Sequence, residues 1–186
     1  MTDTLSKPKR STSATKLTTL FDEGEITARV EELARKAASR LPDNFVAVGL
    51  LVGSFVFIAD LVRALYRLGC SPAVEFMRLS SYGTGRESSG KVRLVGEPEL
   101  DLSGRAVLLI DDIVDTGRSL AYARDLLRGK QASSVLTCAL LDKPSRREVP
   151  IEVDFVGFTI PDVFVVGYGI DYAHGYRHLP FIAKID

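Results

Sequence analysis

Residues 107–120 read VLLIDDIVDTGRSL, in which four apolar residues lead into two adjacent aspartates and then into a short polar stretch. A continuous apolar run of this kind, here Ala106–Ile110, is typical of a β-strand that is buried on both faces of a sheet. The polar stretch Asp115–Ser119 is followed at once by helical periodicity over Leu120–Leu127. A strand that passes through a polar loop into a helix is the repeating unit of parallel sheets.

The chain on either side repeats this alternation of apolar strands and amphipathic helices. Further strands are predicted at Val46–Val52, Ala73–Leu79, Val135–Leu141, Phe155–Phe158 and Val163–Val166, with a short edge arm at Lys91–Val95. Helices are predicted from Ile26 to near Pro42 and over Phe55–Leu68. Because strands that alternate with helices imply right-handed crossovers, the predicted fold class is α/β, with a mostly parallel central sheet flanked by helices.

Composition limits the number of domains and the kinds of partner. The 186 residues suit one domain, and Met1–Thr19 has so few apolar side chains that we expect a disordered tail before a domain at 20–186. Ser80–Gly90 reads SSYGTGRESSG, which predicts a flexible loop. The 24 basic and 24 acidic side chains cancel, which disfavours nucleic acid as a partner.

The sequence also suggests where the protein works. It has no apolar run long enough to span a membrane, and its polar N-terminus does not resemble a secretory signal. We therefore expect a soluble cytoplasmic protein with no membrane partner. Cys70 and Cys138 lack metal-type spacing and lie in apolar segments, so we expect two reduced, buried thiols.

The polar stretch after the acidic pair has the features of a phosphate-binding loop. Thr116, Gly117 and Ser119 place hydroxyl groups and an open backbone at a helix N-terminus, where free N–H groups and the helix dipole attract anions. The loop is not a Walker motif, because Arg118 rather than lysine follows the glycine. Asp111 and Asp112 would repel phosphate, so their partners should be sugar hydroxyls or a divalent cation such as Mg²⁺. The implied ligand is a sugar phosphate.

VLLIDDIVDTGRSL resembles the phosphoribosyl pyrophosphate motif of type I phosphoribosyltransferases. LLVGSFVFIADLVRAL, SSYGTGRESSG, LLDKPSRR and FVVGYGIDYAHGYRHLPFI are similar to segments of the purine branch of that family, the hypoxanthine and guanine phosphoribosyltransferases. The similarity extends over about residues 20–186. It implies the type I phosphoribosyltransferase fold, with a small hood made from the chain ends and a flexible active-site loop.

The resemblance also implies a reaction. Family members transfer the ribosyl phosphate of phosphoribosyl pyrophosphate to N9 of a 6-oxopurine and release pyrophosphate with Mg²⁺. Asp111 and Asp112 would hold the ribose hydroxyls directly or through the metal, and Asp115–Ser119 would hold the 5-phosphate. Asp115 would also face purine N7 as general base or proton relay.

Five further residues correspond to the purine, metal and pyrophosphate sites. The resemblance makes Lys143 a donor to O6 of the purine, which disfavours adenine because its 6-amino group is itself a donor. Phe164 corresponds to the aromatic ring that stacks on the base, and the backbone of Val165 to a contact with its edge. Asp171 corresponds to a second Mg²⁺ ligand at the purine site, and Arg177 to an arginine that binds pyrophosphate.

Two loops complete the expected pyrophosphate site. Many relatives have Lys or Arg where this chain has Val52, so binding there would rest on the backbone amides of Val52, Gly53 and Ser54. A non-proline cis peptide occurs in this loop in some members of the family. Ser81 and Tyr82 correspond to the mobile loop that closes over the reaction centre and excludes water.

Two alternatives to a hypoxanthine or guanine enzyme remain open. One is a xanthine preference, which Lys143 does not exclude because contacts around C2 decide it. The other is a regulator that senses phosphoribosyl pyrophosphate and binds nucleic acid. The neutral net charge disfavours it, as do the retained residues Asp115, Lys143, Asp171 and Arg177. Relatives are commonly homodimers or homotetramers.

Overall fold

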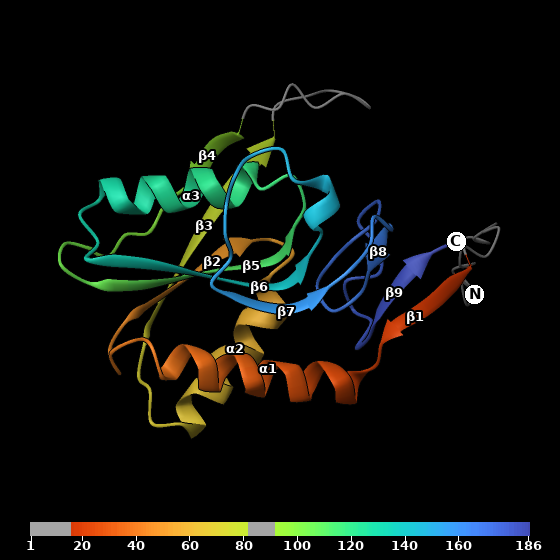
Figure 1. Ribbon diagram of the computed structural model, residues 1–186, viewed down its shortest axis with the longest axis horizontal. Coiled ribbons are helices and arrows are strands. Elements are labelled where there is room, and N and C mark those ends of the chain that lie inside the picture. The colour runs from red at the N-terminus through yellow and green to blue at the C-terminus, as the bar shows by residue number, and fades with distance from the viewer. Residues whose placement is uncertain (1–15, 82–91) are drawn as a thin grey trace, which may run out of the picture.

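The computed structural model describes residues 16–81 and 92–186 and has a three-layer arrangement (Figure 1). A six-stranded sheet forms the middle layer. Its strands are, in spatial order, β4 (Val92–Gly96), β3 (Ala73–Ser81), β2 (Val46–Leu51), β5 (Ala106–Val114), β6 (Ser134–Asp142) and β7 (Phe155–Thr159). All neighbouring strands are parallel except the antiparallel pair β3 and β4. The predicted α/β class with a mostly parallel central sheet is confirmed.

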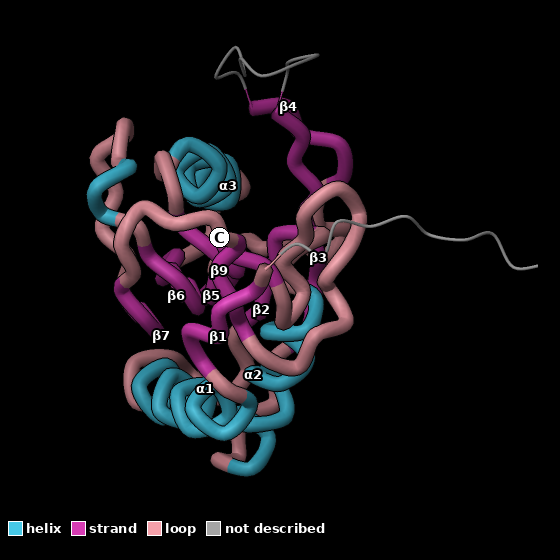
Figure 2. The backbone as a smooth tube through the Cα atoms, turned by 90° about the vertical axis from the view of Figure 1, so that its right-hand side faces the viewer, coloured by secondary structure: helices cyan, strands magenta, loops and turns pink. Residues whose placement is uncertain are grey.

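Helices cover both faces of this sheet. α1 (Glu23–Ala38) and α2 (Phe55–Arg67) lie on one face, and α3 (Arg118–Gly129) lies on the other (Figures 1 and 2). A short 3-10 helix, η1 (Pro144–Arg146), follows β6. Each face of the sheet has its own apolar core, since the buried side chains form two separate clusters.

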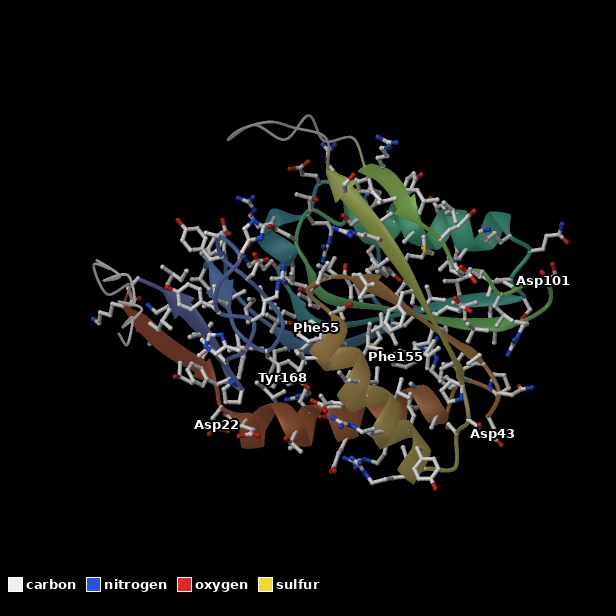
Figure 3. All side chains as sticks on the ribbon, turned by 180° about the vertical axis from the view of Figure 1, so that it is seen from behind. Asp22, Asp43, Phe55, Asp101, Phe155 and Tyr168 are labelled. Carbon is white, nitrogen blue, oxygen red and sulfur yellow. The ribbon has the colours of Figure 1, made fainter. Side chains whose placement is uncertain are left out.

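The first helix shows how local sequence sets its bounds. Its predicted apolar face is buried, namely Ile26, Val30, Leu33 and Ala37. It begins at Glu23, three residues before the first apolar position of the predicted periodicity. The reason is a capping box at the N-terminus of α1, formed by Asp22, which Figure 3 labels, and Glu25. The Glu25 N–H donates to Asp22 Oδ1 at 2.8 Å, and the Asp22 N–H donates to Glu25 Oε2 at 2.9 Å.

β5 extends beyond the predicted strand end at Ile110. Its parallel pairing with β6 continues from Asp111 opposite Ala139 to Val114 opposite Asp142. Backbone pairing is indifferent to side-chain polarity, so the two acidic residues stay in the ladder. They therefore lie on a rigid strand rather than in a loop.

The two ends of the chain form a second, three-stranded sheet with the order β1 (Leu17–Phe21), β9 (Ile182–Ile185) and β8 (Val165–Val166). Both pairings are antiparallel. This small sheet lies at one end of the molecule, beside the carboxyl end of β7 (Figure 1). It is the hood expected from the chain ends.

The predicted boundary of the tail at Thr19 is wrong, because Leu17–Thr19 belong to β1. β1 pairs with β9, and the Thr18 hydroxyl donates to Asp186 Oδ2 at 2.6 Å. These partners are at the other end of the chain, so the composition around residue 17 gives no sign of them. Residues 1–15 of the expected tail lie outside the described residues.

Three further expectations concern the flexible loop, the cysteines and membrane-spanning segments. Ser80 and Ser81 end β3, while the rest of the expected flexible loop, from Tyr82 to Gly90, lies outside the described residues. Cys70 and Cys138 are buried free thiols, as predicted. Within the described part of the chain, no helix has the length and apolar character needed to cross a bilayer.

Candidate active site

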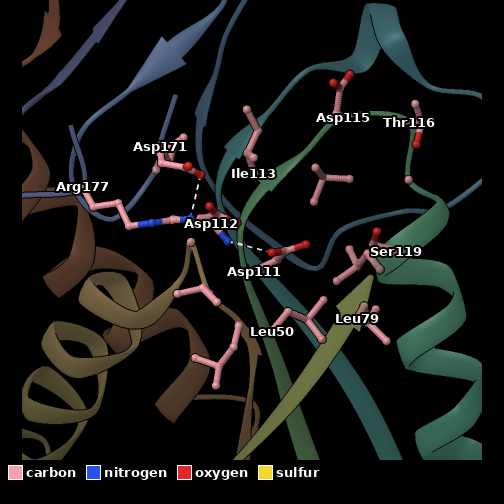
Figure 4. A pocket seen from close by; sticks show the side chains of 17 residues that line it. Leu50, Leu79, Asp111, Asp112, Ile113, Asp115, Thr116, Ser119, Asp171 and Arg177 are labelled. Atoms are coloured by element: carbon pink, nitrogen blue, oxygen red, sulfur yellow. Dashed lines mark hydrogen bonds and ion pairs between the residues drawn. The ribbon is translucent and has the colours of Figure 1, made fainter. Parts of the chain in front are cut away.

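A cavity of about 350 Å³ opens where β2 and β5 end (Figure 4). Three segments line it: Leu50–Gly53 at the exit of β2, Asp111–Gly117 with Ser119 and Leu120 at the exit of β5, and Ile170, Asp171 and Arg177 from the loop between β8 and β9. Leu79 of β3 adds an apolar wall. Ligands of open parallel sheets bind at this edge, so the cavity is where the topology places a site.

The loop after β5 has the geometry of a phosphate cradle. Gly117 has φ +84° and directly precedes α3, whose first-turn N–H groups have no acceptor within the helix. The Arg118 N–H donates to Thr116 Oγ1 at 3.4 Å. A side chain at Gly117 would also crowd Ile151 Cγ2 at 2.8 Å and Arg147 Cδ at 2.9 Å. Thr116 and Ser119 line the cavity as expected. The side chain of Arg118 does not line it, and its Nε donates to Glu148 Oε2 at 2.8 Å.

The two acidic residues of β5 are held close together. Asp111 is only 8% exposed, and its Oδ1 accepts a hydrogen bond from the Asp112 N–H at 3.0 Å. Burial raises the pKa of Asp111 well above its usual value, and the neighbouring charge of Asp112 adds to the effect. Burial also raises the pKa of Asp112. A ligand that offers hydroxyl donors or positive charge would relieve this cost.

An arginine faces the acidic pair from the hood side. Arg177 Nη2 forms an ion pair with Asp171 Oδ1 at 2.7 Å, and its Nη1 donates to the Gly169 carbonyl at 2.6 Å. The positive charge of Arg177 also acts against the rise in the pKa of Asp112. Figure 4 shows Asp171 and Arg177 across the cavity from Asp115 and Thr116. The cavity thus has an acidic floor between a basic side and a phosphate cradle.

The loop after β2 brings its backbone to the acidic pair. The loop contains one non-proline cis peptide among the described residues, between Leu51 and Val52. A Cβ on Gly53 would overlap the carboxylate of Asp112, so only glycine allows this approach. The Ser54 hydroxyl donates to the Leu50 carbonyl and is buried. Val52 and Gly53 line the cavity, whereas Ser54 is fully buried and does not.

Three of the residues expected at the purine, Lys143, Phe164 and Val165, lie outside this cavity. Lys143 is 6% exposed, its N–H donates to the Val114 carbonyl at 2.9 Å, and no carboxylate of the described residues forms an ion pair with it. Phe164 is 55% exposed and makes an edge-to-face contact with Tyr172, with ring centroids 5.4 Å apart. Val165 is buried in β8. Tyr82 lies outside the described residues, and Ser81 ends β3.

Sequence reasoning missed two arginines beside the phosphate loop. Arg146 Nε donates to Asp115 Oδ1 at 3.1 Å, and this contact raises the pKa of Arg146. Arg147 Nη1 donates to the Asp115 carbonyl at 2.7 Å and its Nη2 pairs with Asp142. The only available signal was the SRR of the LLDKPSRR segment, which does not show what the arginines face.

The donor set fits a magnesium ion that is completed by a ligand. Among the described residues, no group of three or more His, Cys, Asp or Glu side chains forms a metal cage. Asp111, Asp112 and Asp171 nevertheless line one cavity. Asp171 Oδ1 is paired with Arg177, and its Oδ2 accepts from the His174 N–H at 3.1 Å. Mg²⁺ prefers oxygen ligands and is commonly held by one or two carboxylates together with substrate phosphates. The residues therefore suit Mg²⁺ that enters with a phosphorylated ligand.

The cavity combines a helix N-terminus and hydroxyl groups, which suit a phosphate, with an acidic pair, which suits hydroxyl groups or a cation. The sequence model described as "Phosphoribosyl transferase domain" matches residues 17–173. The chain belongs to this phosphoribosyltransferase family.

Its relatives include hypoxanthine phosphoribosyltransferase from Escherichia coli K12, 47% identical over 169 residues that make up 89% of this chain and 93% of the relative. Hypoxanthine-guanine phosphoribosyltransferase from Aquifex aeolicus is 44% identical over 173 residues, 92% of this chain and 96% of that protein. A crystal structure of hypoxanthine phosphoribosyltransferase from Staphylococcus aureus matches with a TM-score of 0.85 at 35% identity, covering 96% of this chain and 97% of that one.

Gly53→Ala should weaken binding of ribose 5-phosphate about tenfold or more, because the methyl group would push Asp112 away from the sugar hydroxyls. Isothermal titration calorimetry measures the affinity. Gly129→Ala is the matched control, since a Cβ there meets no atom within 4 Å. Equal affinities for Gly53→Ala and the wild type would contradict the role of this close approach.

Asp111→Asn should raise the free energy of unfolding at pH 7, because burial and the neighbouring Asp112 raise the pKa of Asp111 and so penalise its ionised form. The raised pKa means that the folded protein favours protonated Asp111. That stabilisation is present at acid pH and is lost as pH rises through the raised pKa, so ionised Asp111 destabilises the wild type at neutral pH. Asparagine removes this effect, and the advantage should shrink towards pH 4.

Urea denaturation with a metal chelator at several pH values measures this difference. Asp101→Asn is the control, because hydrogen bonds from the backbone and side chain of Ser103 lower the pKa of Asp101 (Figure 3). It should not stabilise the protein. An Asp111→Asn variant no more stable than the wild type at pH 7 would show that the acidic pair is not a cost to folding.

Proposed function

We propose that this protein is a purine salvage enzyme, a hypoxanthine (guanine) phosphoribosyltransferase. It would transfer the 5-phosphoribosyl group of phosphoribosyl pyrophosphate to N9 of hypoxanthine, and also of guanine, giving IMP or GMP and pyrophosphate. The observation that carries the proposal is the cavity that joins Asp111 and Asp112 to the phosphate cradle of Thr116, Gly117 and Ser119. Relatives at 43–47% identity with hypoxanthine or hypoxanthine-guanine phosphoribosyltransferase names support it.

The cavity suggests how the sugar phosphate is bound. The 5-phosphate accepts hydrogen bonds from the N–H groups at the start of α3 and from the hydroxyls of Thr116 and Ser119. Asp111 and Asp112 accept hydrogen bonds from the ribose hydroxyls. Pyrophosphate lies towards Arg177 and the backbone amides of Val52–Ser54, which neutralise charge on the leaving group. Mg²⁺ held by Asp111, Asp112 and Asp171 would add positive charge that stabilises the departing pyrophosphate.

Asp115 accepts the purine proton in this proposal. Its carboxylate lines the cavity at the edge nearest to the segment that carries Lys143. The purine must lose a proton as N9 attacks the ribosyl carbon, and a carboxylate within hydrogen-bond reach of N7 lowers that barrier. Asp115 therefore acts as the general base.

Lys143 selects the purine. Its ammonium group is a donor only, and no carboxylate of the described residues neutralises it, so it can donate to the O6 of a 6-oxopurine. The 6-amino group of adenine would meet it donor to donor. Phe164, with its exposed ring, supplies a face for stacking, and the Val165 backbone meets the edge of the base.

The proposal also includes the oligomeric state of the enzyme and its place in the cell. Large apolar side chains remain exposed on α2 and β3, including Phe55, Val74 and Phe76, and an interface in a homodimer or homotetramer would cover such side chains. The free thiols of Cys70 and Cys138 suit a reducing compartment, which supports the cytoplasm as the place of action.

The experiment that tests the function is an assay with phosphoribosyl pyrophosphate, Mg²⁺ and hypoxanthine, guanine, xanthine or adenine supplied separately. We expect turnover of hypoxanthine and guanine and none of adenine. A higher kcat/KM for xanthine would establish the xanthine alternative. Binding of phosphoribosyl pyrophosphate without turnover of any purine would replace the enzyme by a ligand-sensing regulator.

Asp115→Asn should lower kcat about 10²-fold or more, because asparagine keeps the shape of the side chain but cannot accept the proton. Binding of phosphoribosyl pyrophosphate should change far less. Steady-state kinetics and calorimetry measure the two effects. Asp125→Asn, on the exposed side of α3, should behave like the wild type. Wild-type turnover by Asp115→Asn would remove Asp115 from the role of general base.

A further inference from the structure

Arg146 contacts the proposed general base from the segment that recognises the purine. It is the last residue of η1, three positions after Lys143. Its Nε donates to Asp115 Oδ1 at 3.1 Å, and its Nη1 lies 3.6 Å from Asp162 Oδ2. Asp162 precedes Phe164, the proposed stacking residue, by two positions. One guanidinium group thus bridges the phosphate loop and the two segments expected around the base.

The backbone fixes the place of Arg146 relative to Asp115. Both Glu148 and Val149 donate their N–H groups to the Thr116 carbonyl, at 3.0 and 3.1 Å. Arg147 holds the Asp115 carbonyl from the same segment. The segment after η1 is therefore fastened along the phosphate loop, and the contact of Arg146 with the carboxylate follows from that attachment.

We propose that Arg146 is a positioning residue for proton transfer, which holds Asp115 Oδ1 so that Oδ2 faces the purine. The proposal rests on the proposed function. A free aspartate side chain rotates about χ1 and χ2, and only some of its rotamers direct an oxygen at the base. A guanidinium has a rigid planar fork, and here Asp162 anchors its other side, so it limits the rotation of the carboxylate.

The contact also determines which oxygen takes the proton. Oδ1 is occupied by the positively charged donor, which disfavours a proton there. As the reaction proceeds, the N7–H bond of the purine breaks, an O–H bond forms at Oδ2, and the released electron pair shifts through the ring so that N9 bonds to the ribosyl carbon. The bond from that carbon to pyrophosphate breaks, and pyrophosphate leaves with its electron pair. Arg146 takes no part in the exchange of protons and acts only through Asp115.

The pair is suited to mutation because it contributes little to folding. The side chains of Arg146 and Asp115 are 47% and 41% exposed, and exposed ion pairs add little to stability. Arg40 and Asp154 form a matched pair elsewhere, with the same 3.1 Å distance and an Arg40 side chain that is 50% exposed. Arg40→Ala therefore serves as the control for loss of an exposed arginine.

The test is a double-mutant cycle on kcat with phosphoribosyl pyrophosphate and hypoxanthine, using wild type, Arg146→Ala, Asp115→Asn and the double variant. We expect Arg146→Ala to lower kcat about tenfold, with the KM for phosphoribosyl pyrophosphate unchanged within about twofold. In the Asp115→Asn background, the same change should cause no further loss. Arg146→Lys should recover part of the activity, since lysine keeps the charge without the fork, and Arg40→Ala should match the wild type.

Two outcomes would overturn the inference. A tenfold loss that adds fully to that of Asp115→Asn would mean that Arg146 acts independently of the base, and wild-type kcat in Arg146→Ala would mean that it has no role. Activity of the wild-type enzyme in the same assay separates these outcomes from failure of the proposed function, which would appear as no turnover by the unaltered protein.

Discussion

The site depends on the parallel pairing of β2 with β5. Their ladder aligns Val46 with Val107 and Gly49 with Ile110, so the two strands finish at the same edge of the sheet. The exit of β2 then passes directly over the acidic residues at the end of β5, at a distance that leaves no room for a side chain on Gly53. Every other feature of the cavity is arranged around this approach of a backbone to a buried carboxylate.

Hydrogen bonds join the segment of the proposed purine site to the loop of the proposed phosphate site. The segment after β6 is bonded along the phosphate loop, through the Lys143 N–H to the Val114 carbonyl and the Arg147 guanidinium to the Asp115 carbonyl. Displacement of one segment must therefore move the other. The phosphate cradle and the proposed purine subsite form one mechanical unit, although they come from different strands.

Sequence patterns predicted the features that depend on nearby residues. The apolar runs of β2, β5 and β6 identify buried strands, and the hydroxyl and glycine pattern at Thr116–Ser119 identifies the loop that lines the cavity and leads into α3. Sequence patterns could not predict features that depend on partners far away along the chain. β1 forms because β9 pairs with it, and the direction of the Arg118 side chain follows from its ion pair with Glu148. The contacts of Arg146 and Arg147 with Asp115 were missed for the same reason, since they join residues more than 30 positions apart.

The hood has a consequence for the order in which the protein becomes complete during synthesis. β8, which follows the exposed ring of Phe164, is held by β9, and β9 is in turn held between β8 and β1. β9 must leave the ribosome before either of these pairings can form. The sheet that carries the acidic pair and the phosphate cradle has all of its strands by Thr159. A nascent chain therefore possesses the elements of the proposed sugar phosphate site before it can pair β8, which adjoins the proposed purine site.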